Sequence, residues 1–586
     1  MTFEQVENRY KRIGKAKKCT FIFCADNGVT EEKVSAYPKA TTVGMVKNYL
    51  VTEGAAANVF ANFASSEMYV VDVGVDADLS QVPKLIGRKI RRGTNNIARE
   101  SAMTSEEANK SIEIGMDLTM KAIAAGFNCF LIGEMGIGNT TAAAAMTAAY
   151  LNLPPEEVTG RGTNIDDEKL QHKIEVVRRA LEVNEPDAKK QLDVFTKLGG
   201  YEFGAMAGVI LAAHEKNCVV ILDGFNSSVA ALIAEEINPK IGESLIASHI
   251  GREKGHRAIL EHLGLNPLLK LDLALGEAIG SSIVARMLDD YSSDDNFDCS
   301  IEKFSNDDSE VEFQLSEQRL ESVELQKYPL TIRLMGEEVE ATDKTFNFYL
   351  QTMPELYPQA MKNCRAILDS LTKPKKSLGY LEDIAVQIAG IANEDFPTNN
   401  LGHALLSFGT DENSPVSGGT LGTKRYLGLV TEDANTKVAF NFGRNLAEEI
   451  TFDTPILTIT NSAEFEALGE ILSATALKAD GTLSYKAEEF LTYVPEKYLG
   501  MTGALIGALV GAAHNSCLII ADMSAVEIIT RYIEELCPQI RPFILHCSRL
   551  MAYKECTSLA DVIAEAALAA LNEMKTFEET GVDKAF

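Results

Sequence analysis

The stretch Gly133-Glu134-Met135-Gly136-Ile137-Gly138-Asn139-Thr140-Thr141 follows a short apolar run, 130–132, and precedes an alanine-rich segment, 142–150. This order predicts a buried strand, a glycine-rich turn and the start of a helix, the repeating unit of an α/β fold. Glycines let backbone N–H groups approach a ligand closely, and a helix N-terminus favours anions. The turn could therefore hold a phosphate-bearing substrate beside the Glu134 carboxylate, although many α/β folds carry such a turn without a ligand.

Apolar runs and helical patterns alternate through the first half of the chain. The predicted strands are 20–24, 68–73, 128–132, 218–222 and 244–247, and the predicted helices include 43–63, 105–125, 167–183 and 204–213. Strands that alternate with helices favour a parallel sheet. We therefore expect an α/β fold, with a Rossmann-like parallel sheet covered by helices.

An internal repeat relates the two halves of the chain. Residues 212–223 and 512–522 share an Ala-Ala-His helix end, an apolar strand and a closing aspartate, and Ile237-Asn238-Pro239-Lys240-Ile241 parallels Leu536-Cys537-Pro538-Gln539-Ile540 at nearly the same offset. A constant offset over so many positions predicts a tandem duplication. We expect a first copy at 1–291, an acidic linker at 292–344 with an edge hairpin at 311–315 and 330–334, and a second copy at 345–586.

Composition limits the classes of function. The 586 residues carry a net charge of −29, which argues against nucleic acid or an anionic membrane as a partner. No apolar run reaches membrane-spanning length, and the first residues lack the core of a signal peptide. The ten cysteines form no C-x-x-C pair and no cluster with histidine at zinc spacing. These features predict a cytoplasmic protein with reduced thiols, no metal site and no cofactor.

Several short motifs follow one another in a characteristic order and spacing along the first copy. They are Cys24-Ala25-Asp26-Asn27-Gly28-Val29, Ser35-Ala36-Tyr37-Pro38, Arg92-Gly93-Thr94-Asn95-Asn96-Ile97-Ala98, Ala102-Met103-Thr104, Gly133 to Thr141, Gly160-Arg161-Gly162-Thr163, Leu222-Asp223-Gly224-Phe225, Ala247-Ser248-His249, Glu253-Lys254-Gly255-His256 and Leu275-Gly276-Glu277. Together they resemble the nicotinate-nucleotide:dimethylbenzimidazole phosphoribosyltransferases, which make the lower-ligand nucleotide of cobamides. The resemblance implies transfer of phosphoribose from nicotinate mononucleotide to an aromatic base.

The leader of this family, a helix followed by a Thr-Lys-Pro-type turn, does not precede the first copy. A similar turn, Leu371-Thr372-Lys373-Pro374-Lys375-Lys376-Ser377-Leu378-Gly379, precedes the core of the second copy. The family typically forms homodimers, so the chain resembles such a dimer fused into an internal pseudo-dimer. In the second copy Leu457-Thr458-Ile459-Thr460-Asn461-Ser462 replaces the glycine-rich turn, and Glu565, opposite Glu277, lies between alanines. This copy is predicted to be structural or to complete a pocket.

Roles for two carboxylates follow from the resemblance. Glu277, in the Leu-Gly-Glu motif, is the implied general base, and an apolar pocket would raise its proton affinity. Glu134 resembles the second carboxylate, which lies near the ribose, where an anion steadies positive charge on the sugar. The alternatives are a glutamate favoured at a helix N-terminus for Glu277 and a solvent-facing loop residue for Glu134.

The other implied contacts are with the substrates. The backbone of Gly136, Gly138 and Gly162, with Lys173, resembles the 5′-phosphate site, to which Asn139 and Thr140 belong; Lys173 could instead be a surface lysine. Gly251 belongs to this site where the family often has serine, and Asn27 replaces a common histidine. Tyr37, Pro38, Met45 and Met135 would line the slot for the aromatic acceptor, or would be plain core. Asp223 either orients a substrate hydroxyl or caps the next helix.

Two alternatives to the benzimidazole-type reaction stay open. Some relatives with two unlike subunits also accept phenols, whose proton is harder to remove, at pKa ~10. A non-catalytic nucleotide-binding protein could also keep this fold. A nicotinamide-dependent oxidoreductase lacks support, because the turn is not G-x-G-x-x-G.

Overall fold

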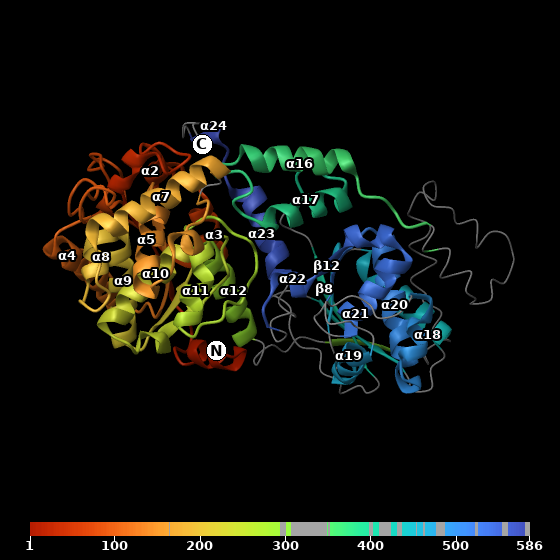
Figure 1. The fold of residues 1–586 in the computed structure, drawn as a ribbon. Coiled ribbons are helices and arrows are strands. Elements are labelled where there is room, and N and C mark those ends of the chain that lie inside the picture. The colour runs from red at the N-terminus through yellow and green to blue at the C-terminus, as the bar shows by residue number, and fades with distance from the viewer. Residues whose placement is uncertain are drawn as a thin grey trace.

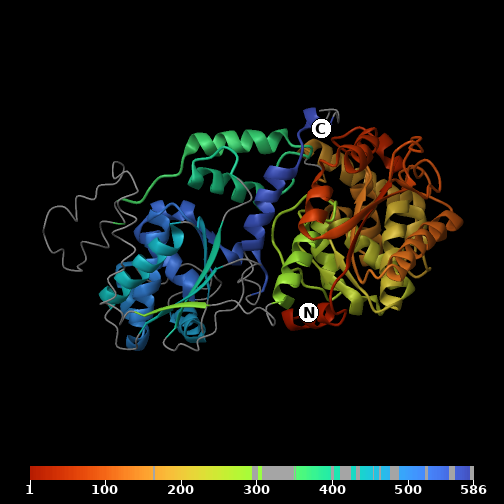
Figure 2. The ribbon, with the colours of Figure 1, turned by 180° about the vertical axis from the view of Figure 1, so that it is seen from behind.

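The computed structural model describes residues 1–162, 165–293, 301–305, 349, 352–397, 402–409, 424–430, 436–452, 454–460, 463–475, 487–521, 525–553 and 561–580. Two α/β units lie side by side, the first copy in red to yellow and the second in green to blue (Figures 1 and 2). The predicted hairpin at 311–315 and 330–334 lies outside the described residues.

The first copy is built on a six-stranded parallel sheet with the order β3-β2-β1-β4-β5-β6. Its strands are β1 Lys18–Ala25, β2 Ser66–Gly74, β3 Ile86–Gly87, β4 Cys129–Met135, β5 Val219–Leu222 and β6 Leu245–Ala247. Successive residues of β1 alternate between two cores, since Ile22 packs on one face of the sheet and Phe21 and Phe23 on the other. A parallel sheet covered on both faces explains why its strands are continuous apolar runs. The α/β prediction and its five strands are confirmed.

Helices cover both faces of this sheet. They are α1 Phe3–Lys11, α2 Thr41–Lys47, α3 Ala56–Phe63, α4 Ser105–Ala124, α5 Asn139–Leu151, α6 Pro155–Val158, α7 Asp167–Asn184, α8 Asp193–Leu198, α9 Tyr201–Glu215, α10 Phe225–Ile237, α11 Lys254–His262 and α12 Ile279–Ser293, with short helices η1 Gly28–Glu32, η2 Asn48–Thr52 and η3 Ile241–Ser244. The single helix predicted over 43–63 is wrong. A π-helical turn, η2, follows α2, and Glu53 with φ 52° then turns the chain before α3.

The second copy repeats the sheet, with the order β7-β9-β8-β10-β11-β12 and parallel pairing throughout. Its strands are β7 Ile301–Ser305, β8 His403–Gly409, β9 Lys424–Leu429, β10 Ile456–Ile459, β11 Leu518–Ala521 and β12 Ile544–His546. Edge strand β7 lies within the predicted acidic linker, so that segment also contributes to the second sheet. The corresponding edge strand of the first copy, β3, comes instead after β2.

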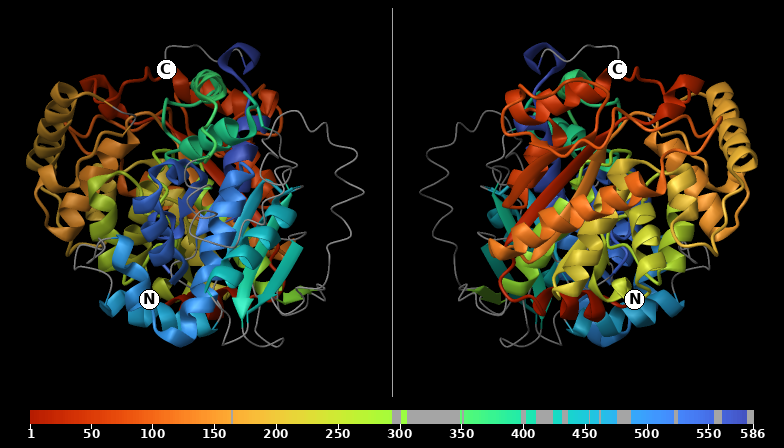
Figure 3. Two further views of the ribbon diagram at one scale, coloured as in Figure 1. Left: turned by 90° about the vertical axis from the view of Figure 1, so that its right-hand side faces the viewer. Right: turned by 90° about the vertical axis from the view of Figure 1, so that its left-hand side faces the viewer.

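Helices of the second copy are α18 Thr436–Thr451, α19 Ala463–Thr475, η5 Ala487–Tyr493, η6 Glu496–Tyr498, α20 Leu499–His514, α21 Ala525–Leu536, η7 Pro538–Phe543, α22 Cys547–Leu550, α23 Asp561–Glu573 and α24 Phe577–Thr580. The leader segment consists of α16 Pro358–Ser370, the turn 371–379 and α17 Tyr380–Ala392. Figure 1 shows α23 between the two units and α16 and α17 along the top of the second unit, and Figure 3 views the molecule from its two ends. One continuous apolar core extends from α3 and α12 through these helices into the second sheet.

Two general features complete the description. No helix among the described residues is long and apolar enough to cross a membrane. Eight cysteines fall within the described ranges, and all eight are buried. The cytoplasmic location stays a prediction.

Candidate active site

A cavity opens at the C-terminal ends of the first sheet, where parallel α/β folds bind ligands. The chain lines it with Glu134 to Ile137 at the end of β4, Gly224 to Asn226 after β5, and His249 and Gly251 to Glu253 after β6. The remaining lining residues are Tyr37, Thr41, Met45, Asn139, Thr140, Gly162, Leu273 to Glu277 and, from the leader segment, Thr372, Lys373 and Pro374. Both predicted catalytic carboxylates therefore face one cavity.

Glu134 ends β4 and is 7% exposed. The side-chain amides of Asn139 and Asn226 both donate to its carboxylate, the latter at 2.7 Å. Gly276 packs so closely that a Cβ there would lie 2.1 Å from Glu134 Oε1 and would displace this carboxylate. Burial raises the pKa of Glu134 to about 8, although the hydrogen bonds from the two side-chain amides act in the opposite direction and lower it.

Glu277 lies just before α12 and is 6% exposed. The Ala57 amide donates to its Oε2 at 3.3 Å, and Tyr49 of the π-helical turn lies beside it. The next residue, Ala278, has φ +62°, a left-handed conformation that is strained for alanine. Burial raises the pKa of Glu277 to about 7, which suits a group that accepts a proton near neutral pH.

Asp223 does not line the cavity and does not cap the next helix, α10. Its carboxylate accepts from the Ser281 amide at 3.1 Å and from other amides at the start of α12. The predicted cap of the next helix is therefore wrong, and a contact with a substrate hydroxyl stays a prediction. Asp223 instead fixes the start of the helix that directly follows Glu277.

The glycine-rich loops form one end of the cavity. Gly136 and Gly162 line it with Asn139 and Thr140, whereas Gly138 stands behind it at φ +93°, a conformation that favours glycine. Lys173 is not a surface residue: it is 1% exposed and donates from Nζ to Thr140 Oγ1 at 2.8 Å. Lys173 Nζ also lies against Gly162, since a Cβ at Gly162 would be 3.2 Å away. The Gly162 backbone, the Thr140 hydroxyl and the Lys173 ammonium group thus lie together there.

The Glu253 carboxylate lies at the end of the cavity that the glycine-rich loops form. Glu253 Oε1 accepts a hydrogen bond from the Gly162 amide at 2.7 Å, and its Oε2 is buried without a hydrogen-bond partner. The Glu253 charge also acts on Lys173, whose pKa burial lowers. In this structure Glu253 therefore holds the donor that the sequence assigned to phosphate.

The predicted acceptor slot is only partly assembled as expected. Tyr37, Met45 and Met135 line the cavity, joined by Leu273 and Leu275, which the sequence did not single out. Pro38 is exposed and outside it. Gly251 also lines the cavity, beside His249 and the Leu273 carbonyl.

The leader segment closes the cavity of the first copy. Ala274 donates its amide to Ser377 O, and Tyr380 donates to Leu271 O, both at 2.9 Å. Within the turn, Lys373 Nζ contacts Glu382 Oε1 at 2.7 Å, and both side chains are at most 1% exposed. The sequence did not reveal which copy the leader packs on; the turn lies against the first copy.

The sequence did not predict several polar residues of the site, among them Asn226, His249 and Glu253. His249 and Glu253 were visible within family-like motifs, but no local pattern showed that their side chains face the cavity. Asn27, which replaces a common histidine, donates to the buried Glu202 carboxylate at 2.8 Å. That contact joins residues far apart in the sequence and has no local signal.

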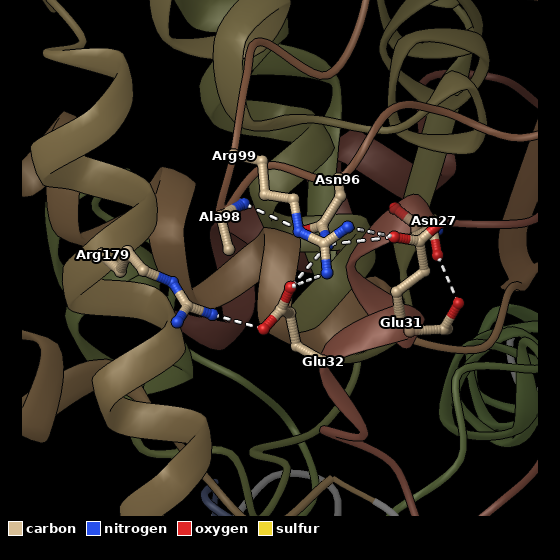
Figure 4. Close-up of polar contacts among 8 residues, drawn as sticks. Asn27, Glu31, Glu32, Asn96, Ala98, Arg99 and Arg179 are labelled. Carbon is tan, nitrogen blue, oxygen red and sulfur yellow. Dashed lines mark hydrogen bonds and ion pairs between the residues drawn. The ribbon is translucent and has the colours of Figure 1, made fainter.

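An ion-pair network supports the outer side of α7, the helix that carries Lys173 (Figure 4). Glu32 accepts from Asn96 at 2.8 Å and forms ion pairs with Arg99 at 3.0 Å and Arg179 at 2.5 Å. Arg179 belongs to α7, whereas Glu32 ends η1. The network therefore ties this helix to the loops beside the cavity.

Comparison with known proteins agrees with this arrangement. A family model described as phosphoribosyltransferase matches residues 5–291 and 353–412, more than half of the chain. The nicotinate-nucleotide–dimethylbenzimidazole phosphoribosyltransferase of Geobacter sulfurreducens is 45% identical over 273 residues, which are 47% of this chain and 77% of that protein. The enzyme of the same name from Thermus thermophilus is 47% identical over 267 residues, 46% of this chain and 79% of that protein.

A solved structure of CobT from Thermus thermophilus is 43% identical and has a TM-score of 0.47, covering 49% of this chain and 87% of that one. The family match includes the first copy and the leader segment, the two parts that enclose the cavity. The chain therefore belongs to the nicotinate-nucleotide–dimethylbenzimidazole phosphoribosyltransferase family.

Proposed function

We propose that this chain transfers the phosphoribosyl group of nicotinate mononucleotide to an aromatic lower-ligand base such as 5,6-dimethylbenzimidazole. The products are nicotinate and the α-ribazole 5′-phosphate used in cobamide assembly. One observation carries the proposal: Glu134 and Glu277, both buried, line one cavity whose end is formed by glycine-rich loops. Within the described residues neither carboxylate forms an ion pair, so both remain available to a ligand.

The reaction is a displacement at C1′ of the ribose. A ring nitrogen of the incoming base attacks C1′ as the bond from C1′ to the nicotinate nitrogen breaks, and nicotinate leaves with that electron pair. Attack from the opposite face inverts C1′ and gives the α-nucleotide. The incoming base then loses its N–H proton to the Glu277 carboxylate, whose raised proton affinity suits this step.

Glu134 has a different role in this proposal. Positive charge builds on the sugar as nicotinate departs, and a fixed anion beside C1′ stabilises it. The amides of Asn139 and Asn226 hold the carboxylate in place. The phosphate lies at the other end, against Gly136, Gly162 and Lys173, so the substrate is positioned at both ends.

The chain also forms an internal pseudo-dimer in this proposal. The leader segment belongs in sequence to the second copy, yet Thr372, Lys373 and Pro374 line the cavity of the first. Hydrogen bonds from the 271–274 loop region to the leader support this arrangement. The second copy thus completes the site without performing the reaction.

The test is product formation by the purified chain. Nicotinate mononucleotide is offered with dimethylbenzimidazole, adenine, phenol and p-cresol in competition, and products are separated by chromatography with mass detection. An α-N-nucleotide supports the proposal, whereas an α-O-glycoside as main product identifies a phenol-specific enzyme. No product from folded protein that still binds the mononucleotide would support a non-catalytic binding protein instead.

A further inference from the structure

His249 is a buried residue of the cavity wall that no step of the proposed reaction uses. It follows β6 and is 1% exposed. Gly280 makes room for its ring, because a Cβ at that position would lie 2.0 Å from His249 Nδ1. Glycines at 224 and 251 flank the other ring nitrogen, and a Cβ at either would be 3.6 or 3.7 Å from Nε2. These two glycines leave open space beside Nε2.

The hydrogen-bond directions assign the tautomer of His249. Ser248 donates its single hydroxyl proton to Asp223 O at 2.9 Å. Its oxygen lies 3.0 Å from His249 Nδ1 and has only lone pairs left for that contact. Nδ1 must therefore carry the ring proton, and Nε2 presents a lone pair.

The neutral form of the ring agrees with its surroundings. Burial lowers the pKa of His249 to about 4, so the imidazole stays uncharged at neutral pH. Nearby, His256 accepts from the Gly251 amide at Nδ1 and contacts Ser228 Oγ through Nε2, both at 3.0 Å. His256 therefore uses both nitrogens within the protein and does not line the cavity. His249 lines the cavity and uses one.

We propose that His249 Nε2 accepts a hydrogen bond from a ribose hydroxyl of the mononucleotide, a contact that rests on the proposed function. A neutral lone pair repels a phosphate oxygen and attracts a hydroxyl donor. The site lies on the sugar side of the cavity, because Gly224 is two residues from Asn226, which holds Glu134. A side chain at position 251 would begin in contact with His249 Nε2, at 3.7 Å, whereas Gly251 adds no atoms there.

The experiment compares two substitutions that mimic the two ring nitrogens. His249→Asn keeps a donor near Nδ1 for Ser248 and removes Nε2, whereas His249→Gln places an amide oxygen near Nε2. Each full-length variant and the wild type are assayed with nicotinate mononucleotide and with its 2′-deoxy and 3′-deoxy analogues. His256→Gln is the matched control, and melting curves report folding.

We expect His249→Asn to lower kcat/KM for the mononucleotide roughly three- to tenfold, the effect of one hydrogen bond. With the analogue that lacks the contacted hydroxyl, wild type and His249→Asn become equal. His249→Gln recovers part of the loss. His256→Gln lowers kcat/KM for all three nucleotides by the same factor, because His256 bonds to Ser228 and the Gly251 amide and does not line the cavity.

Equal losses with all three nucleotides for His249→Asn would overturn the contact, as would unchanged kinetics. If the wild type forms no product with any base, the proposed function has failed, and the same comparison is made by calorimetric binding of the three nucleotides. A binding difference that disappears with one deoxy analogue then retains the contact. Equal binding of the three nucleotides, or no binding of the mononucleotide to the wild type, overturns it.

Discussion

The two copies share one sheet order but differ at the ends of their strands. In the first copy β4 contains Glu134 and continues into a glycine-rich turn, whereas β10 of the second ends at Ile459 and is followed by Thr460. Directly after the last strand the first copy has Ser248 and His249, and the second has Cys547 and Ser548. Both sheets form despite these differences, because burial of their apolar faces stabilises them and the residues at the strand ends do not affect that burial.

Buried carboxylates show the difference most clearly. In the second copy Glu527 is 6% exposed, contacts Arg531 at 2.6 Å and accepts from Ser548 at 2.5 Å. In the first copy Glu134 and Glu277 are equally buried, yet only neutral donors reach them. An arginine partner stabilises a carboxylate and removes its basicity. A carboxylate that must accept a proton therefore lacks such a cationic partner, and its buried charge then lowers the stability of the fold.

The largest expected effect is on kcat, and it should differ between variants of the first copy and variants of the second. Glu277→Gln should lower kcat roughly 10²- to 10⁴-fold, because it removes the base for the incoming ring. Glu565→Gln, a change in α23 at the residue that the sequence aligns with Glu277, should leave kcat unchanged. Steady-state kinetics with nicotinate mononucleotide measure both, and comparable losses in the two variants would contradict the division of roles.

The pKa of Glu277 also predicts the pH below which the rate of this reaction decreases. Glu277 acts only when ionised, and its pKa is about 7. The rate should therefore fall as pH drops below 7 in the wild type. A rate that stays constant down to pH 5 would exclude Glu277 as the proton acceptor.

The next effect concerns the boundary between the copies. Lys373→Met should reduce the free energy of unfolding by about 3 kcal/mol, because it leaves the Glu382 carboxylate buried beside only Arg365, 3.2 Å away. Adding Glu382→Gln should restore part of that stability, since the glutamine oxygen still accepts from the Leu378 amide. Denaturant unfolding measures both, and an unchanged midpoint for Lys373→Met would show that the pair is not needed.

The sequence predicted most of this fold because buried parallel strands are apolar on both faces and can be read locally. The break within 43–63 was missed, since apolar residues continue through η2 and nothing local marks a π-helical turn. The place of Lys373 was missed for another reason: it depends on contacts between residues about a hundred positions apart, such as Ala274 with Ser377. Side-chain directions in loops, as at His249 and Glu253, likewise come from tertiary packing.

A smaller effect tests whether the buried Glu277 carboxylate, which has no cationic partner among the described residues, lowers the stability of the first copy. The pKa of Glu277 is raised from 4.5 to about 7, so its contribution to stability is fully present below pH 4.5 and is lost as pH rises through 7. Glu277→Gln has no such loss. It should be more stable than wild type by about 1–3 kcal/mol at pH 8.5 and nearly equal at pH 5. Melting curves at both values check this, and a variant less stable at pH 8.5 would contradict it.

A further effect concerns the carboxylate that stands where phosphate is proposed to bind. Glu253→Gln keeps a hydrogen-bond acceptor for the Gly162 amide and removes a negative charge, so the KM for nicotinate mononucleotide should fall roughly three- to tenfold. Nicotinate riboside, which lacks the phosphate, is the control and should show no change. A higher KM for the mononucleotide would mean that the Glu253 charge is needed to hold the loop.

The smallest effect comes from the surface network of Figure 4. Arg99 contacts Glu31 and Glu32 at 3.0 Å, the same kind of contact as that between Lys373 and Glu382, but its side chain is 62% exposed. Water screens such a pair and offers each charge other partners. Arg99→Gln should therefore change the free energy of unfolding by about 0–1 kcal/mol and leave kcat/KM within twofold.

Glu32 keeps its contacts with Asn96 and Arg179 in that variant, so α7 and Lys173 should stay in place. Denaturant unfolding and kinetics of Arg99→Gln beside Lys373→Met make the comparison direct. The two substitutions remove one cation each, and burial of the partner carboxylate is the main difference between them. A loss as large for Arg99→Gln as for Lys373→Met would mean that the network, rather than burial, determines how firmly each wall of the cavity is held.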